Sequence, residues 1–176
     1  WDVSSGTDFS GMFYGADKFN SDLSNWDVSK GTNFESMFRN ANAFNQDIGS
    51  WDVSSGTNYS YMFRGTNDFN QDLSNWNVSN GTNFENMFSE SSFNQDISTW
   101  DVSKGTDFSD MFSSNSSFNQ DISNWNVSKG NDFYAMFSRA SSFNQDIGSW
   151  DVSSGTDFSA MFANIAFNPD IGNWNV

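Results

Sequence analysis

One tryptophan returns every 24 or 25 residues along this 176-residue chain, and no tryptophan lies outside the series. Each one opens the same phrase, Trp-Asp/Asn-Val-Ser, and much of the following segment repeats with it. A fixed period of roughly 20 to 50 residues indicates a repeat architecture. The sequence therefore predicts a single domain of seven repeats plus the start of an eighth, without capping repeats. The expected repeats are 1–25, 26–50, 51–75, 76–99, 100–124, 125–149 and 150–173, followed by 174–176.

Large apolar residues recur at fixed places in every repeat. All methionines stand in Met-Phe pairs, and the phenylalanines fall into three columns. One repeat cannot bury such a face alone, whereas stacked neighbours bury it continuously. The two 24-residue repeats lose their residue between Phe88 and Phe93 and between Phe162 and Phe167. Because loops tolerate changes in length, this segment is predicted to be a surface loop.

Secondary structure was inferred from periodicity. Apolar and polar residues alternate around Trp51 and Val53, which predicts a short parallel strand in each repeat. Phe34, Met37 and Phe38 have the i, i+3, i+4 spacing of one helix face, and Thr32 with Glu35 matches a capping box. The expected fold class is an α/β-type repeat solenoid of seven coils, each with a short parallel β-strand and a short helix or 3-10 turn.

Two further columns predict structural ladders between coils. The tryptophans are expected to stack as the central buried residue of each strand, and the Asn after Phe is expected to bond its own loop and the next coil. A glycine in every repeat, such as Gly56, indicates a turn that a Cβ would hinder. The predicted ladder residues are Trp26, Trp51, Trp76, Trp100, Trp125, Trp150, Asn45, Asn70, Asn94, Asn119 and Asn144.

The pattern F-N-x-D-I-x-x-W-D-V-S-x-G-T-x-F-x-x-M-F resembles the 25-residue repeats of bacterial surface proteins of the mycoplasma lipoprotein type. Those repeats are grouped with BspA-like leucine-rich repeats, and Ile48-x-x-Trp51-x-Val53 takes the place of L-x-x-L-x-L. The resemblance implies a leucine-rich-repeat-like solenoid, location on the cell surface or outside the cell, and an adhesive or structural role. This chain departs from the family in having Gly where Val is common before Thr, and Phe or Tyr where Met often follows, which suggests a volume exchange in the core.

Composition narrows the classes of function. A net charge of −15 argues against nucleic acid and anionic membranes as partners, and no apolar run is long enough for direct membrane insertion. The chain has no histidine and no cysteine, and no nucleotide-binding or nucleophile motif occurs. Carboxylate pairs recur in every repeat, so no single repeat is distinguished as a catalytic centre. The sequence predicts no enzyme and no resident cofactor.

Rows of aspartates leave two interpretations open. They can cap backbone N–H groups and form a solvated face, or they can bind Ca²⁺ between adjacent coils, because carboxylates are hard oxygen ligands. No EF-hand or G-G-x-G-x-D motif supports the second interpretation. The Ca²⁺ candidates are Asp22, Asp27, Asp47, Asp52, Asp72, Asp96 and Asp101. Possible glycosylation sequons begin at Asn58, Asn77, Asn80, Asn115 and Asn126.

The leading functional prediction is an extracellular or cell-surface structural or adhesive protein. The chain opens and closes within a repeat, so we expect a segment of a longer array or head-to-tail stacking into a fibre. The alternative is a module that binds glycans, Ca²⁺ or a host surface protein through its repeated polar face; ice binding is disfavoured because that face is charged. The loop after Met-Phe varies most between repeats, at 14–18, 39–43 and 64–68, and is the expected place for partner contacts.

Overall fold

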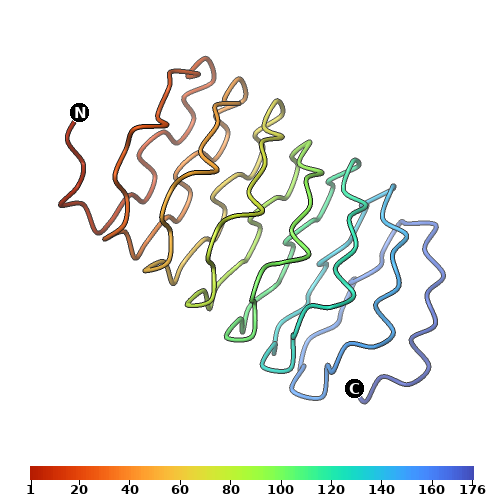
Figure 1. Cartoon of the computed structure of the whole chain (residues 1–176). Helices are drawn as coiled ribbons and strands as arrows, with labels where there is room; N and C mark the ends of the chain where they lie inside the picture. Colours follow the sequence, from red (N-terminus) through yellow and green to blue (C-terminus); the bar gives the residue numbers. More distant parts are fainter.

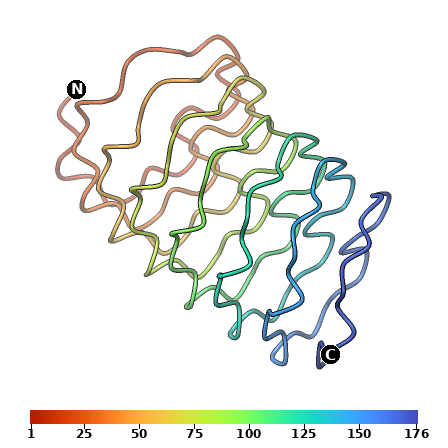
Figure 2. The same cartoon turned by 45° about the vertical axis from the view of Figure 1, so that its right-hand side comes forward.

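The chain winds through successive coils that lie side by side, with the two termini at opposite ends (Figures 1 and 2). A computed structural model describes all residues, 1–176. Residues that pair between neighbouring coils are 24 or 25 positions apart, so each coil takes one sequence repeat. The repeat period read from tryptophan is thus the length of one coil.

The expected α/β-type solenoid is wrong, because the coils contain no helix and no extended strand. Regular structure is limited to isolated parallel bridges, one residue from each coil, and turns and irregular backbone make up the rest. Because these elements are absent, the expected secondary structure of a leucine-rich repeat is absent as well. The bridges run Asp8–Asn33, Asn33–Asn58, Asn58–Asn83, Asn83–Asp107, Asp107–Asp132 and Asp132–Asp157.

The predicted helix is replaced by a turn-rich segment, which spans 33–41 in the second coil and the equivalent residues elsewhere. Its N–H groups alternate between two kinds of partner: Met37 donates to Phe34 O within the coil, whereas Phe38 donates to Met62 O of the next coil at 2.9 Å. Ser36 and Asn40 have positive φ angles of 55° and 58°, which no α-helix contains. Turns therefore satisfy the i, i+3, i+4 apolar spacing while half of the N–H groups bond across coils.

The predicted capping box is also absent, because there is no helix start for it to cap. The N–H of Glu35 donates to the side-chain oxygen of Asn33 at 3.2 Å, and the Thr32 hydroxyl donates to Thr7 O of the preceding coil at 3.1 Å. The polar residues that resemble a cap thus close an Asx turn and tie one coil to the next.

The predicted strand is replaced by what we call the tryptophan segment, 45–56 between the second and third coils and its equivalents. Within it, Trp51 N–H donates to Ile48 O and Gly56 N–H donates to Val53 O. These local bonds fold the segment into consecutive turns, and its backbone makes no hydrogen bond to the backbone of another coil. Alternation of apolar and polar residues reports which side chains are buried here, and it does not report a strand.

The core is one cluster of 41 buried residues that runs along the stack. Trp26 and Trp51 stack with ring centroids 6.4 Å apart and an interplanar angle of 5°, and Phe38 packs on Phe44 of its own coil at 4.0 Å. Phe38 also stacks on Phe63 of the next coil at 5.7 Å. Aromatic rings such as Phe38 therefore contact rings within their own coil and across the coil interface, which buries a face that one repeat alone leaves exposed.

The repeated glycine is explained by close approach. A Cβ on Gly81 would lie 2.5 Å from Cζ of Phe84 and 3.0 Å from Val78 O. The end of the phenylalanine ring occupies the space that a side chain on this glycine would need. This pairing agrees with a volume exchange between the glycine and phenylalanine columns.

One short loop is completed by the following coil. The fourth coil lacks one residue between Phe88 and Phe93, and Asn115 of the fifth coil is fully buried beside it. The Asn115 amide donates to Phe93 O at 3.0 Å, and its oxygen accepts the N–H of Phe118 at 3.0 Å. A buried side chain thus compensates for the missing residue, since buried polar groups require partners.

Candidate functional site

The aspartate rows predicted to bind Ca²⁺ or to cap the backbone are occupied by backbone bonds. Asp72 accepts the N–H of Ser74 at 2.8 Å, and Asp52 accepts the N–H of Ser54 at 3.0 Å. Equivalent Asx turns recur at Asp22, Asp27, Asp47, Asp96 and Asp101. No group of three or more Asp, Glu, His or Cys side chains gathers as a metal site. Ca²⁺ binding stays a prediction, and capping is the role that the geometry shows.

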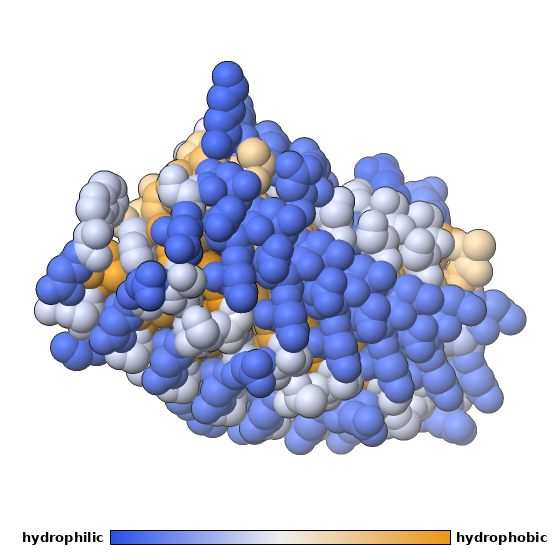
Figure 3. Space-filling view, turned by 45° about the horizontal axis from the view of Figure 1, so that its top comes forward, coloured by the Kyte–Doolittle hydropathy of each residue, from blue (hydrophilic) through white to orange (hydrophobic).

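Hydrogen bonds from serine lower the pKa of several of these carboxyl groups. The hydroxyl and then the N–H of Ser29 hold the pKa of Asp27 below its ordinary value, and Ser54 does the same for Asp52. Because these hydrogen bonds favour the ionised form, the rows remain charged near neutral pH. On the face drawn in Figure 3, hydrophilic residues lie in rows along the stack.

Asparagine ladders link the coils through side-chain oxygens. The oxygen of Asn45 accepts the N–H of Asn70 at 3.1 Å and an N–H of the Gln71 side chain at 2.9 Å. The same contact joins Asn70 to Asn94, Asn94 to Asn119 and Asn119 to Asn144. These asparagines are half-buried or exposed, so the ladder lies at the edge of the core.

Each inner tryptophan bonds the preceding coil as well as stacking on it. Nε1 of Trp100 donates to Leu73 O at 3.0 Å and is buried. The same bond is made by Trp51, Trp76, Trp125 and Trp150. Trp26 is half-buried and contributes its stacked ring.

The five sequons differ in accessibility. Asn77, Asn80 and Asn126 are exposed and Asn58 is half-buried, whereas Asn115 has no exposed surface. Burial excludes Asn115 as a glycan acceptor in the folded chain. Glycosylation of the other four stays a prediction.

A group of large polar side chains covers the turn-rich segments of the first four coils. We call it the tyrosine–arginine patch, and it consists of Tyr14, Arg39, Tyr61, Arg64, Glu85 and Glu90. The guanidinium carbon of Arg39 lies 5.4 Å from the ring centroid of Tyr14 and 4.8 Å from that of Tyr61. Arg64 lies over Tyr61 at 5.9 Å and pairs with Glu90 at 2.9 Å. Tyrosine and arginine thus alternate along the stack and hold one another in place.

Tyr61 and Glu85 complete the patch. The Tyr61 hydroxyl donates to a Glu85 carboxylate oxygen. Burial, with help from the hydrogen bond to Glu85 and its charge, raises the pKa of Tyr61 to about 12. The phenol therefore remains a neutral donor over the physiological range.

Sequence reasoning located part of this patch. The variable loop after Met-Phe includes Tyr14, Arg39 and Arg64. Tyr61 is not distinguished by the sequence, and Glu85, the equivalent of Glu35, is predicted to close a capping box, because both stand before the Met-Phe pair, where a helix is expected. The turn backbone directs them outward, and Tyr61 does so with a φ of 58°. The residue type at these two positions changes from repeat to repeat, and this variation is the sequence signal that could have identified them.

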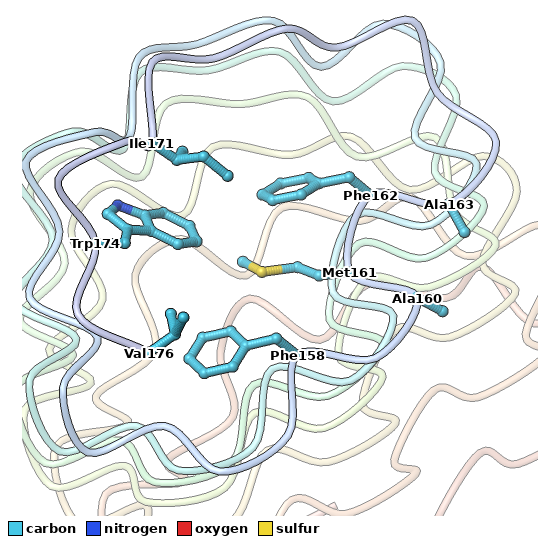
Figure 4. Close-up of a pocket in the computed structure, with 8 residues that line it drawn as sticks. All are labelled: Phe158, Ala160, Met161, Phe162, Ala163, Ile171, Trp174 and Val176. Carbon is cyan, nitrogen blue, oxygen red and sulfur yellow. The ribbon is translucent and has the colours of Figure 1, made fainter.

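The C-terminal end of the stack is a hollow of about 410 Å³ lined only by apolar residues. The side chains of Phe158, Met161, Phe162 and Trp174 point toward one another across it (Figure 4). The other lining residues are Ala160, Ala163, Ile171 and Val176. A second hollow of about 290 Å³ at the opposite end includes Trp1, Phe13 and Trp26.

The repeat pattern and the coil geometry can be compared with known families. The family model described as "Mycoplasma protein of unknown function, DUF285" matches residues 1–92 and again residues 79–174. The chain belongs to the DUF285 family. The match confirms the resemblance to mycoplasma-type repeat proteins, but it does not support the finer placement among BspA-like leucine-rich repeats. No curated protein and no solved structure matches the chain, and no helix capable of crossing a membrane is present.

Proposed function

We propose that this DUF285 chain is a non-enzymatic structural or adhesive protein on the cell surface or outside the cell. The observation that carries the proposal is the sameness of its coil interfaces. In each of the six interfaces, four N–H groups of one turn-rich segment bond to carbonyl groups of the next, as Phe34, Ser36, Phe38 and Asn40 do. A stack that adds coils by one repeated set of bonds suits a spacer or scaffold.

The two ends offer complementary groups for further coils. At the C-terminal end the N–H groups of Phe158, Ala160, Phe162 and Asn164 have no partner, although their equivalents in all other coils do. At the N-terminal end the matching carbonyls of Asp8, Ser10, Met12 and Tyr14 are free. We propose that an identical coil covers these faces, supplied by a longer array or by a second copy stacked head to tail.

Electron microscopy and light scattering of the purified chain test the stacking between copies. Particles longer than one chain are expected, and Val176→Asp should shorten them because a carboxylate would enter the apolar end. Val176 is exposed, so the change should not unfold the coil. Ser141→Asp, at an exposed serine away from the end, is the charge-matched control. A discrete monomer at all concentrations would exclude stacking between copies. A longer array within one chain would then be the remaining source of the covering coil.

Surface location needs a separate experiment. Antibodies against the chain should label intact cells that express the full-length protein. Labelling only after permeabilisation would refute the extracellular part of the proposal.

A further inference from the structure

Two buried side-chain polar atoms in the whole protein lack a hydrogen-bond partner, and they are Nε of Arg39 and Nε of Arg64. Both belong to the tyrosine–arginine patch and lie in adjacent coils. Buried polar groups in native proteins nearly always find partners, so an exception calls for an explanation. Both atoms are buried beneath one small part of the surface, so a ligand there would meet the terminal nitrogens of Arg39 and not its Nε.

Coil geometry does not require these arginines. Ser89, Ser113 and Ser138 occupy the equivalent position in later coils. The coil interface is the same there, since Phe112 N–H donates to Met136 O at 2.9 Å just as Phe38 N–H donates to Met62 O. Serine therefore serves the fold at this position, and the arginines are superfluous for stacking.

Arg39 is stacked against two tyrosine rings and still lacks a carboxylate partner. Its guanidinium lies between the rings of Tyr14 and Tyr61, and its side chain forms neither a hydrogen bond nor an ion pair within the protein. Arg64, in contrast, is paired with Glu90. The planar fork of an arginine matches the two oxygens of a carboxylate, and prior immobilisation lowers the entropy lost on binding.

The surroundings of Arg39 narrow the chemistry of its partner. Tyr14 is 55% exposed and offers an aromatic ring, whereas Glu85 and Glu90 are engaged by the Tyr61 hydroxyl and by Arg64. The patch contains no aliphatic side chain, Phe or Trp, and Tyr14 is its only exposed ring, so the apolar area it offers fits one sugar ring and not an extended protein surface. A net charge of −15 repels polyanions but tolerates a single carboxylate.

We propose that the tyrosine–arginine patch binds a sugar acid at the end of a glycan. Arg39 binds the sugar carboxylate, and an apolar face of the sugar ring packs on Tyr14. This inference rests on the folded coils alone and does not depend on surface location or on stacking.

Titration of the purified chain with a trisaccharide that ends in sialic acid, followed by NMR, tests the proposal. The matched probe is the same trisaccharide with its carboxylate reduced to an alcohol. Shifts are expected for residues of the patch, and the reduced sugar should bind about tenfold more weakly, as for the loss of one charge-assisted contact. Equal affinity for both sugars, or no binding of either, would overturn the proposal.

Variants of the patch then test which residues bind the sugar. Arg39→Ser introduces the residue found in later coils and should abolish the preference for the acidic trisaccharide over the reduced one. Tyr14→Ser should weaken the binding of both trisaccharides. Lys104→Ser removes one positive charge at another edge, where other coils also carry serine, and should leave binding unchanged. If Arg39→Ser retains the preference with unchanged melting, the patch is not the site. Binding of a glutamate-rich peptide in place of the sugar acid would also refute the sugar assignment.

Discussion

The two sides of each coil are bonded to the neighbouring coil in different ways. In the turn-rich segment the backbone bonds directly to the next coil, as from Phe38 N–H to Met62 O. In the tryptophan segment side chains make the connection, as from Trp51 Nε1 to Leu23 O or from Asn70 N–H to the Asn45 oxygen.

This difference explains where the sequence repeats and where it varies. Backbone bonds are available to every residue type except proline, so outward residues on the turn-rich side are free to change between coils. Side-chain bonds need a particular donor or acceptor at each coil, so the tryptophan side is nearly invariant. The variable side is therefore where individual coils acquire distinct surface chemistry, such as the tyrosine–arginine patch.

The largest expected effect comes from breaking a side-chain connection on the invariant side. Trp100→Phe removes the buried bond to Leu73 O, which then accepts only the N–H of Trp76. We expect a loss of about 2–3 kcal/mol in the free energy of unfolding, from the lost hydrogen bond and the lost ring volume. Urea denaturation measures it, with the outward Ser113→Ala as the control that should change little. Similar stability of the two variants would contradict the comparison.

The glycine column gives the next effect. Gly81→Ala places a Cβ against Cζ of Phe84 and should cost about 1–3 kcal/mol through overpacking. Phe84→Leu shortens the opposing side chain, so the double variant should be more stable than the sum of the single changes predicts. A double-mutant cycle with a coupling energy below about 0.5 kcal/mol would show that the two columns do not exchange volume.

A smaller effect with the opposite sign is expected on the variable side. Ala160 has a φ of 56°, a conformation that disfavours L-residues, and it is exposed. Ala160→Gly should therefore stabilise the chain by roughly 0.5–1 kcal/mol in thermal unfolding. Ala140→Gly, at a buried site without positive φ, should destabilise it. Destabilisation by both changes would refute the backbone assignment.

The smallest effect concerns acid. The pKa of Asp52 is lower in the folded chain because Ser54 donates to its carboxylate. The ionised form thus stabilises the fold above the unfolded pKa of about 3.9, and this contribution is lost as the pH falls through the folded value. Asn77 stands at the equivalent place in the next coil and closes the same turn. Asp52→Asn should therefore keep the turn and reduce the drop in melting temperature between neutral and acid pH, whereas an unchanged drop would exclude this role.

The sequence predicted some residues of the tyrosine–arginine patch and not others. The variable loop identified Tyr14, Arg39 and Arg64 as the place for partner contacts, because departures from a repeat are visible in sequence. Tyr61 was missed, and Glu85 was predicted to cap a helix, because the segment that carries them imitates a helix. The spacing of Phe34, Met37 and Phe38 fits a helix and this turn-rich segment equally well, since both bring i, i+3 and i+4 to one side.

The sequence by itself determined the period of the coil, the apolar columns that stack, and the asparagine column that links neighbouring coils. These features follow from composition at fixed spacing, which survives any local backbone conformation. Only the tertiary structure decided that backbone N–H groups such as that of Phe38 bond to the next coil and not to their own. That choice depends on a neighbour 24 or 25 residues away, which satisfies donors that a helix would have paired within the segment.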